Sequence, residues 1–313
     1  MTTAVIFNGQ GAHYQGMGMD FIEHYPQAKK VITCASQVSG EDIKALLNED
    51  FSKLSQTRYA QIATVATSMA IFRSIESQLP AINYMAGLSL GEYSALMASG
   101  MLSMEDGFQL LKERGNLMSN HCEQLKKDEN IVMEAVLKAP LEDIQQLVNQ
   151  VNQDERHLYI ANLNSSTQTV IGGKQSAVDQ FKKLGKEKGI KKTIPLAVEG
   201  PFHTPFMEAV CQPFRLVLDQ VDFNDAEVPV ISNTDVKVHQ INQVRDTLTR
   251  HLIEPVRWKN TIDYFVAHGV DKIIQIGPGK TLGNLLKREK KAPDYVVVDS
   301  VDDIQGLESF LEG

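Results

Sequence analysis

The chain has 313 residues, 42% of them hydrophobic, so it can bury a large core spread over about two domains or over one domain with an insertion. Its 39 acidic and 31 basic residues give a net charge of −8, which argues against a general nucleic-acid or membrane-surface binder. The amino terminus carries no basic region before its apolar run, and no segment has the length needed to span a bilayer. We therefore expect a cytoplasmic protein.

The cysteines are Cys34, Cys122 and Cys211. They are odd in number, widely spaced and without metal-ligand spacing, so the sequence predicts neither a disulfide framework nor a zinc site. We expect all of them to be buried thiols.

The amino-terminal part of the chain predicts a strand, a loop and a helix. Thr3–Phe7 is a short run of β-forming residues that enters Gly9-Gln10-Gly11, and a helix is expected over residues 19–25. A longer helix is expected over residues 61–79, where apolar residues recur at helical spacing until Pro80 ends the run.

A nucleophile elbow follows this helix. An apolar run over residues 81–86 enters Gly87-Leu88-Ser89-Leu90-Gly91, and residues 92–98 predict the start of a helix. A serine at a sharp strand-to-helix turn exposes its hydroxyl, and a glycine two residues to either side lets the backbone make that turn. The pentapeptide alone is a weak signal, because glycine and serine are common in ordinary turns. With a strand before it and a helix after it, it predicts acyl transfer through a serine ester.

The middle of the chain predicts a small inserted subdomain. Its expected elements follow the order βαββαβ over residues 131–137, 141–151, 158–162, 169–171, 176–188 and 191–197. That order is the signature of a ferredoxin-like module, which we expect at residues 128–197. The predicted fold class is therefore α/β, in which an α/β-hydrolase-like large subdomain with a parallel sheet, made from residues 1–127 and 198–313, carries this insertion.

The larger body has further expected elements on both sides of the insertion. A helix is expected over residues 104–122, with Ser103 as a candidate N-cap. After the insertion we expect strands over residues 228–232 and Lys272–Ile276, and a helix over residues 261–268 that feeds the second strand.

A serine nucleophile needs a base, and His203 is the best candidate. It lies in a loop fixed by Gly200, Pro201 and Pro205, and a histidine held in a rigid turn is well placed to take the Ser89 hydroxyl proton. The alternative is a histidine that only stabilises its loop, which would carry more weight if Ser89 were absent.

With these motifs in order, the chain resembles the malonyl-CoA:acyl carrier protein transacylase family, including discrete acyltransferases that act in trans in fatty acid or polyketide synthesis. The similarity spans nearly the whole chain. It is carried by Phe7-Asn8-Gly9-Gln10-Gly11, Gly87-Leu88-Ser89-Leu90-Gly91-Glu92-Tyr93, Arg114-Gly115-Asn116-Leu117-Met118, Pro201-Phe202-His203-Thr204-Pro205-Phe206-Met207, Ser232-Asn233-Thr234, Pro255-Val256-Arg257-Trp258 and Ile276-Gly277-Pro278-Gly279-Lys280.

The resemblance implies a catalytic mechanism. Ser89 would take malonate from malonyl-CoA and pass it to the phosphopantetheine thiol of an acyl carrier protein, with His203 as base and then acid. The backbone N–H groups of Gln10 and Leu90 would form the oxyanion hole. Arg114 would bind the free carboxylate of malonate through two hydrogen bonds, although without the family it reads as a solvent-facing helix residue. No metal or other cofactor is implied, and a monomer is the default expectation.

Four further residues are candidate substrate contacts. Phe202 resembles the bulky residue of malonyl-selective members, where it would crowd an α-methyl group, and Met118 shares a helical face with Arg114. Both are equally ordinary core residues. Asn162 and Asn164 resemble positions that line the cleft between the subdomains, but they also suit ordinary turns.

The chain departs from the family's pattern at several positions. Asn8 replaces the usual proline, Leu88 the histidine that often precedes the nucleophile, and Ala12-His13 the usual Ser-Gln. His251 replaces a glutamine whose backbone carbonyl orients the catalytic histidine. Any residue supplies that carbonyl, so we expect function to survive, while the His251 side chain is a candidate determinant of acyl preference.

Two other functions remain open from the sequence. A hydrolase of the same fold would clear stalled acyl groups from carrier proteins, using Ser89 and His203 but having no use for Arg114. An inactive scaffold would only bind carrier proteins. A cluster of lysines is a candidate docking surface for an acidic carrier protein, although a solvated helix face is the simpler interpretation: Lys182, Lys183, Lys186, Lys188, Lys191 and Lys192.

Overall fold

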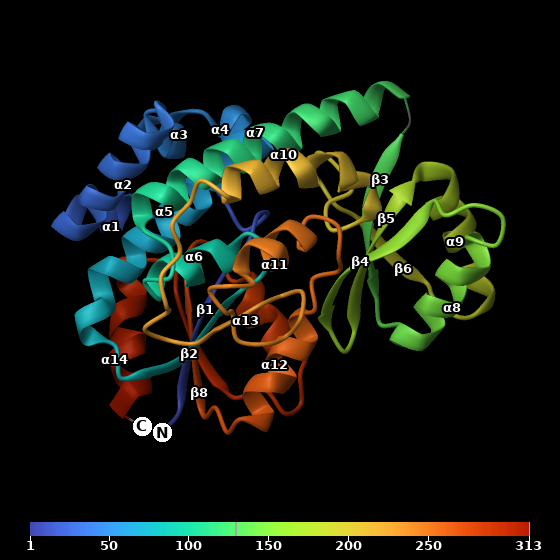
Figure 1. The fold of residues 1–313 in the computed structure, drawn as a ribbon. Coiled ribbons are helices and arrows are strands. Elements are labelled where there is room, and N and C mark those ends of the chain that lie inside the picture. The colour runs from blue at the N-terminus through green and yellow to red at the C-terminus, as the bar shows by residue number, and fades with distance from the viewer. Residues whose placement is uncertain (129, 313) are drawn as a thin grey trace.

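The computed structural model describes residues 1–128 and 130–312, which form a larger and a smaller body side by side (Figure 1). Positions 129 and 313 belong to the predicted domain ranges but lie outside the described residues. Each body is built on its own β-sheet. The α/β fold class with a parallel main sheet is confirmed, while the domain bounds at residues 127/128 and 197/198 stay a prediction.

The larger body contains a parallel five-stranded sheet in the order β7-β2-β1-β8-β9. Its strands are β1 Thr3–Phe7, β2 Ile82–Gly87, β7 Val230–Ile231, β8 Lys272–Ile276 and β9 Asp294–Val298. The first strand is buried on both faces, because Val5 and Phe7 pack into one hydrophobic cluster while Ala4 and Ile6 pack into another on the opposite side. Because β1 and β2 run parallel, their carboxyl ends meet at one edge of the sheet.

Helices cover both faces of this sheet. They are α1 Met19–His24, α2 Pro26–Ser39, α3 Ile43–Glu49, α4 Phe51–Leu54, α5 Thr57–Ile75, α6 Gly91–Ala98, α7 Met104–Asp128, α10 Glu208–Leu218, α11 Val244–Arg250, α12 Trp258–Ala267, α13 Thr281–Leu286 and α14 Ile304–Glu312. Short 3₁₀ turns lie at Glu76–Gln78, Pro205–Met207 and Val301–Asp303.

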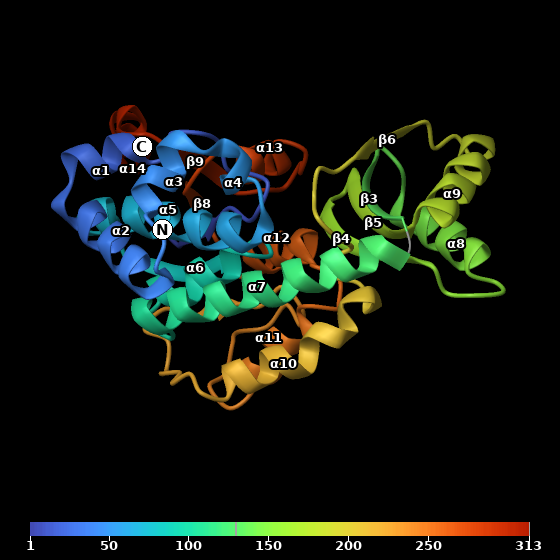
Figure 2. The same cartoon turned by 90° about the horizontal axis from the view of Figure 1, so that it is seen from above.

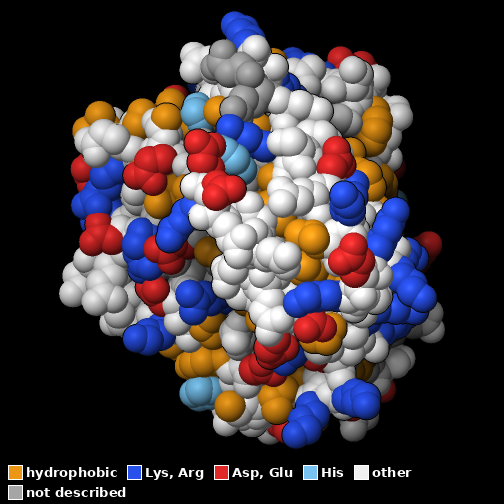
Figure 3. All heavy atoms as spheres, turned by 90° about the vertical axis from the view of Figure 1, so that its right-hand side faces the viewer, with side chains coloured by type: hydrophobic (Ala, Val, Ile, Leu, Met, Phe, Trp, Pro, Cys, Tyr) orange, Lys and Arg blue, Asp and Glu red, His pale blue; other side chains and the backbone are white. Residues whose placement is uncertain are grey.

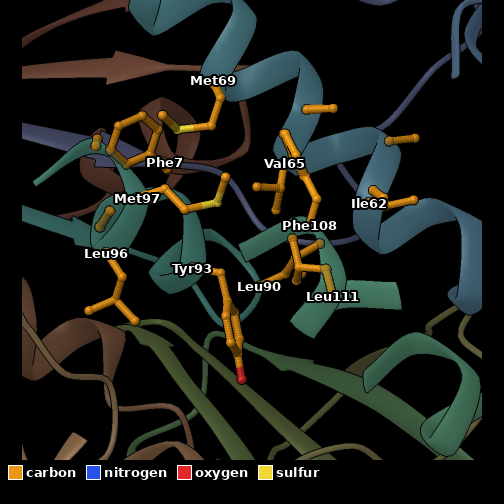
Figure 4. Close-up of a cluster of buried hydrophobic side chains, with 14 of the residues drawn as sticks. Phe7, Ile62, Val65, Met69, Leu90, Tyr93, Leu96, Met97, Phe108 and Leu111 are labelled. Atoms are coloured by element: carbon orange, nitrogen blue, oxygen red, sulfur yellow. The ribbon is translucent and has the colours of Figure 1, made fainter. Parts of the chain in front are cut away.

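The helix that follows the elbow, α6, is buried at every position. Figure 4 shows Tyr93, Leu96 and Met97 of α6 among side chains of α5, α7 and β1. Such all-round burial explains why α6 shows no apolar stripe in the sequence. It also gives the elbow a rigid support.

The helix expected over residues 104–122 runs on to Asp128 as α7. Ser103 caps it as predicted, since its hydroxyl accepts a hydrogen bond of 3.0 Å from the Asp106 N–H. No glycine or proline interrupts residues 121–128, so the sequence contains no stop signal at Cys122. The extra turns carry α7 from the larger body to the start of the smaller one (Figure 2).

The smaller body has the predicted βαββαβ order, with β3 Ile131–Leu137, α8 Leu141–Val151, β4 Leu158–Ser165, β5 Gln168–Lys174, α9 Gln175–Glu187 and β6 Lys192–Pro195. Its strands pair antiparallel in the order β4-β5-β3-β6, which is the ferredoxin-like arrangement. Ile144 and Phe181 join α8 and α9 to the sheet in a separate hydrophobic core.

The surface of the smaller body mixes charges of both signs. Figure 3 shows Lys and Arg side chains interspersed with Asp and Glu over this face. Within the predicted lysine cluster, Lys182 is paired with the buried carboxylate of Glu134, and Lys188 donates to Gln146 over 3.0 Å. These contacts fit a solvated helix face and leave the docking role of the cluster a prediction.

Some elements differ from the sequence-based expectation. The strand expected over residues 228–232 is only Val230–Ile231, although the Pro229 carbonyl still accepts from the Met85 N–H over 2.8 Å. Helix α2 and strand β9 were not among the elements predicted from the sequence. Strand β9 lies at the edge of the sheet, where residues 294–297 are exposed or half-buried, and this partial burial weakens its apolar pattern.

Candidate active site

The elbow forms a strained turn between β2 and α6. Ser89 has a φ of 52°, in the left-handed region that favours glycine. A Cβ on Gly87 would lie 1.9 Å from the Gly91 carbonyl carbon, and a Cβ on Gly91 would lie 2.2 Å from the Phe7 carbonyl oxygen. Both glycines are therefore required by close backbone contacts, which hold the Ser89 side chain above the sheet edge.

The Ser89 hydroxyl points at His203. Its Oγ lies 2.6 Å from His203 Nε2, and His203 Nδ1 lies 2.7 Å from the carbonyl oxygen of His251. Because a carbonyl oxygen can only accept, Nδ1 carries the proton and Nε2 is free to accept one from Ser89. The predicted nucleophile and base are thus brought together, and the orienting group is a backbone carbonyl.

The surroundings keep His203 neutral. Burial lowers the pKa of His203 to about 3, and the positive charge of Arg114 acts in the same direction. The hydrogen bond to the His251 carbonyl acts the other way and raises this pKa. At neutral pH the imidazole is consequently ready to accept a proton.

The loop after β1 packs directly against the elbow. A Cβ on Gly9 would lie 2.3 Å from the Leu88 carbonyl oxygen and 3.6 Å from the Leu90 nitrogen, so Gly9 permits this close approach. The Gln10 side chain is held aside by a hydrogen bond of 3.1 Å from its Nε2 to Thr57 Oγ1. Leu90 stands at the N-terminal end of α6, where backbone N–H groups lack helical partners and attract negative charge.

Arg114 is a buried cation without a carboxylate partner. Its exposed fraction is 2%, and among residues 1–128 and 130–312 no Asp or Glu forms an ion pair with it. Its Nη1 donates to Gln61 Oε1 over 2.7 Å, and its guanidinium carbon lies 5.2 Å from the centre of the Tyr93 ring. The Nε atom is buried with no hydrogen-bond partner. An unpaired buried charge is costly, so this arrangement calls for an anionic ligand.

A cavity of about 330 Å³ joins these groups at the junction of the two bodies. Eight of the nine predicted site residues line it: Gln10, Ser89, Leu90, Arg114, Met118, Asn162, Phe202 and His203. Asn164 lines it as well, and β3 and β5 add Met133, Gln168 and Val170. One cavity thus contains both the Ser89 hydroxyl and the cationic side chain of Arg114.

The structure does not bring the His251 side chain to this cavity. His251 is fully buried and does not belong to the cavity lining. Its ring lies behind His203, with the ring centres 4.9 Å apart. Only its carbonyl faces the catalytic histidine, so a direct contact of the His251 side chain with substrate has no support in this geometry, and its effect on acyl preference stays a prediction.

The family assignment rests on comparisons with known proteins. The acyl transferase domain family matches residues 5–309. The malonyl CoA-acyl carrier protein transacylase of Bacillus subtilis is 35% identical over 304 residues, covering 96% of this chain and 95% of that protein. The chain belongs to the malonyl CoA-acyl carrier protein transacylase family. The family resemblance of the sequence motifs is thereby confirmed.

Solved structures of transacylases have the same fold. The Streptococcus pneumoniae MCAT structure has a TM-score of 0.93 at 39% identity and covers 99% of this chain and 100% of its own. A malonyl-transacylase solved in complex with its type II PKS acyl-carrier protein has a TM-score of 0.92 at 32% identity, with coverage of 99% and 100%. No helix in the described ranges is long and apolar enough to cross a membrane.

Several residues that support the site were not assigned a role from the sequence. Gln61 and Tyr93 hold Arg114, and Asn233 contacts the elbow, where its Oδ1 accepts from the Ser89 N–H over 2.6 Å. Two signals in the sequence pointed to Asn233: the share of Ser232-Asn233-Thr234 in the family resemblance and its place after an expected buried strand. Within the described ranges, no group of three or more His, Cys, Asp or Glu residues is arranged to hold a metal ion.

Proposed function

We propose that this chain transfers a malonyl group from malonyl-CoA to the phosphopantetheine thiol of an acyl carrier protein through a malonyl ester of Ser89. The observation that carries the proposal is Arg114, a buried guanidinium that lines the same cavity as Ser89 and has no carboxylate partner among the described residues. The names of the relatives and the transacylase–carrier protein complex support the same donor and acceptor.

In the first half-reaction, Ser89 Oγ attacks the thioester carbonyl while His203 Nε2 takes its proton over the observed 2.6 Å contact. The negative oxygen of the tetrahedral intermediate accepts hydrogen bonds from the N–H groups of Gln10 and Leu90. The carbon–sulfur bond then breaks, and the CoA thiolate leaves with the proton from His203. The product is malonyl-Ser89 with His203 neutral again.

The second half-reaction reverses these steps with a new thiol. His203 takes the proton of the phosphopantetheine thiol, and the thiolate attacks the ester carbonyl of malonyl-Ser89. The bond to Ser89 Oγ breaks, and His203 returns the proton to the serine. Both halves use the same groups, as expected of a ping-pong mechanism.

Arg114 gives the selectivity in this proposal. Gln61 occupies Nη1 and the Tyr93 ring supports the guanidinium, so the Nε side of the fork remains for the two carboxylate oxygens of malonate. An acetyl group makes no such contact. Phe202, which also lines the cavity, is proposed to crowd an α-methyl substituent.

The proposed chemistry uses only protein groups, so it calls for no cofactor. The cytoplasmic location is part of the same proposal, because Cys34, Cys122 and Cys211 are free thiols and free thiols suit a reducing compartment. The carrier protein's pathway, fatty acid or polyketide synthesis, is left open by these groups.

Loading of the enzyme by malonyl-CoA and acetyl-CoA, followed by intact mass spectrometry, tests the proposal. The wild type should gain one malonyl group, and Ser89→Ala should gain none. Arg114→Ala should load malonate about 100-fold more slowly and acetate nearly as before, because a buried charged contact is lost only with the diacid. The malonyl loading rate of Arg114→Lys should lie between those of the wild type and Arg114→Ala, since lysine keeps the charge but cannot form the two parallel hydrogen bonds.

Two outcomes would contradict the proposal. A malonyl adduct on Ser89→Ala would remove Ser89 as the nucleophile. Equal losses for malonyl and acetyl loading in Arg114→Ala would remove the carboxylate role. Faster release of the acyl group to water than to carrier protein would instead support the hydrolase alternative.

A further inference from the structure

Asn233 bridges both sides of the nucleophile. Its Oδ1 accepts from the Ser89 N–H over 2.6 Å, and its Nδ2 donates to the Gly87 carbonyl oxygen over 2.7 Å. Asn233 is fully buried and comes from the segment directly after β7, not from the elbow itself. One carboxamide thus fixes the backbone on both sides of the turn whose strained residue is Ser89.

Asn233 is itself fixed by a buried carboxylate. Glu92, in the first turn of α6, accepts from the Asn233 backbone N–H through Oε2 over 2.9 Å. Its other oxygen, Oε1, lies 2.7 Å from His239 Nε2. The Glu92 and His239 side chains have exposed fractions of 0% and 1%. A carboxylate this deep needs such hydrogen-bonded partners, so the position of Glu92 is strongly specified.

The same cluster adjoins the support of the base. His251 Nε2 lies 3.9 Å from Glu92 Oε2, beyond hydrogen-bond reach but in direct proximity. The His251 carbonyl oxygen accepts from His203 Nδ1. Nucleophile and base are therefore held by neighbouring groups, Asn233 on the Ser89 side and His251 on the His203 side, with Glu92 between them.

The geometry points to Asn233, Glu92 and His239 as positioning residues for acyl transfer at Ser89. Asn233 holds the serine in its left-handed conformation, Glu92 fixes Asn233, and His239 fixes Glu92. None of these side chains belongs to the cavity lining, so they act through Ser89 and not through substrate. The inference rests on the proposed role of Ser89 as nucleophile.

Asn233→Ala tests this inference, with Asn152→Ala as a matched control. The Asn152 side chain also ties a turn, since Nδ2 donates to the Leu158 carbonyl over 2.7 Å and Oδ1 accepts from the His157 N–H over 3.0 Å, but it lies outside the cavity lining. Both variants should unfold at lower urea concentration. Only Asn233→Ala should slow Ser89, by about 100-fold in labelling by a fluorophosphonate and in malonyl loading, with KM for malonyl-CoA nearly unchanged.

A wild-type labelling rate in Asn233→Ala, or an equal loss in Asn152→Ala, would overturn the inference. Labelling needs no malonyl group, so it decides the matter even if the wild type fails to load malonate, a result that would count against the proposed function alone.

Rescue at Glu92 provides a second, independent test. Glu92→Gln keeps an oxygen for the Asn233 N–H and should label within about threefold of wild type, whereas Glu92→Leu has similar size but no acceptor and should label about tenfold or more slowly. If Asn233→Ala does not fold, the comparison of Glu92→Gln with Glu92→Leu still tests whether this cluster positions Ser89. Equal labelling by Glu92→Gln and Glu92→Leu would show that Glu92 only fills space.

Discussion

His203 has a backbone conformation that usually favours glycine, and its surroundings keep its imidazole neutral. Its φ of 61° lies in the left-handed region, and its N–H donates to the Leu252 carbonyl over 3.1 Å. The carbonyl of the preceding residue in that segment, His251, accepts from Nδ1 of the His203 ring over 2.7 Å. In this strained conformation the imidazole points at the nucleophile, with Nε2 of His203 2.6 Å from Oγ of Ser89.

The pH dependence of loading should reflect this environment. Because burial and the Arg114 charge lower the pKa of His203 to about 3, the free enzyme keeps a neutral base as the pH falls. Malonyl loading in single turnover should therefore show no loss from His203 between about pH 8 and about pH 5. A half-maximal rate near the ordinary histidine pKa of 6.5 would contradict this expectation.

The same lowered pKa has a consequence for stability. Below the ordinary value of 6.5 the unfolded chain binds a proton at residue 203 while the native state does not, so the contribution of neutral His203 is present above that value and is lost as the pH falls toward about 3. The free energy of unfolding, measured by urea unfolding at several pH values, should therefore decrease as the pH falls from about 6.5 toward 3.

At the scale of elements, the elbow depends on contacts that only glycine permits. Gly87→Ala would place a Cβ 2.0 Å from the Gly91 carbonyl oxygen and 2.4 Å from the Glu92 nitrogen, and both obstacles are backbone. We expect a loss of unfolding free energy of about 1–3 kcal/mol or more, together with slower Ser89 loading, because β2 and α6 must separate.

Gly306→Ala is the matched control for the elbow glycine. Gly306 lies in α14 with nothing within 4 Å of an added Cβ, so alanine should raise the unfolding free energy by about 0.5–1 kcal/mol through helix propensity. Urea unfolding of both variants measures the difference. Similar stability of Gly87→Ala and wild type would show that the elbow adapts without cost.

The sequence revealed the elbow because its determinants are local. Gly87, Ser89 and Gly91 lie within one pentapeptide, and strand and helix patterns frame it. Asn233 is 144 residues from Ser89, and an asparagine after a short strand carries no local sign of the partner that its carboxamide meets. Arg114 and Gln61 likewise meet only through packing of α5 against α7. Family resemblance supplied the role of Arg114, and nothing local supplied that of Gln61.

At the scale of the whole molecule, one short segment joins the smaller body to the site. The Val256 N–H donates to the Ala161 carbonyl over 2.9 Å, and the Leu163 N–H donates to the Val256 carbonyl over 2.8 Å, so Val256 extends the edge of β4. The next residue, Arg257, donates its N–H to the Asn233 carbonyl over 3.0 Å. The strand that carries Asn162 is thereby tied through backbone to the residue that supports Ser89.

Val256→Pro should loosen this junction, because proline removes the N–H that bonds to the Ala161 carbonyl. Hydrogen exchange at Leu163 should become about tenfold faster, as expected when one backbone hydrogen bond is lost. Malonyl loading should fall as well, since Asn162 lines the cavity from β4. Val256→Ala keeps the N–H and shortens a buried side chain. It should therefore lower the free energy of unfolding without selectively speeding hydrogen exchange at Leu163. Identical exchange in the two variants would mean that side-chain packing, and not the backbone bridge, sets the position of the smaller body over Ser89.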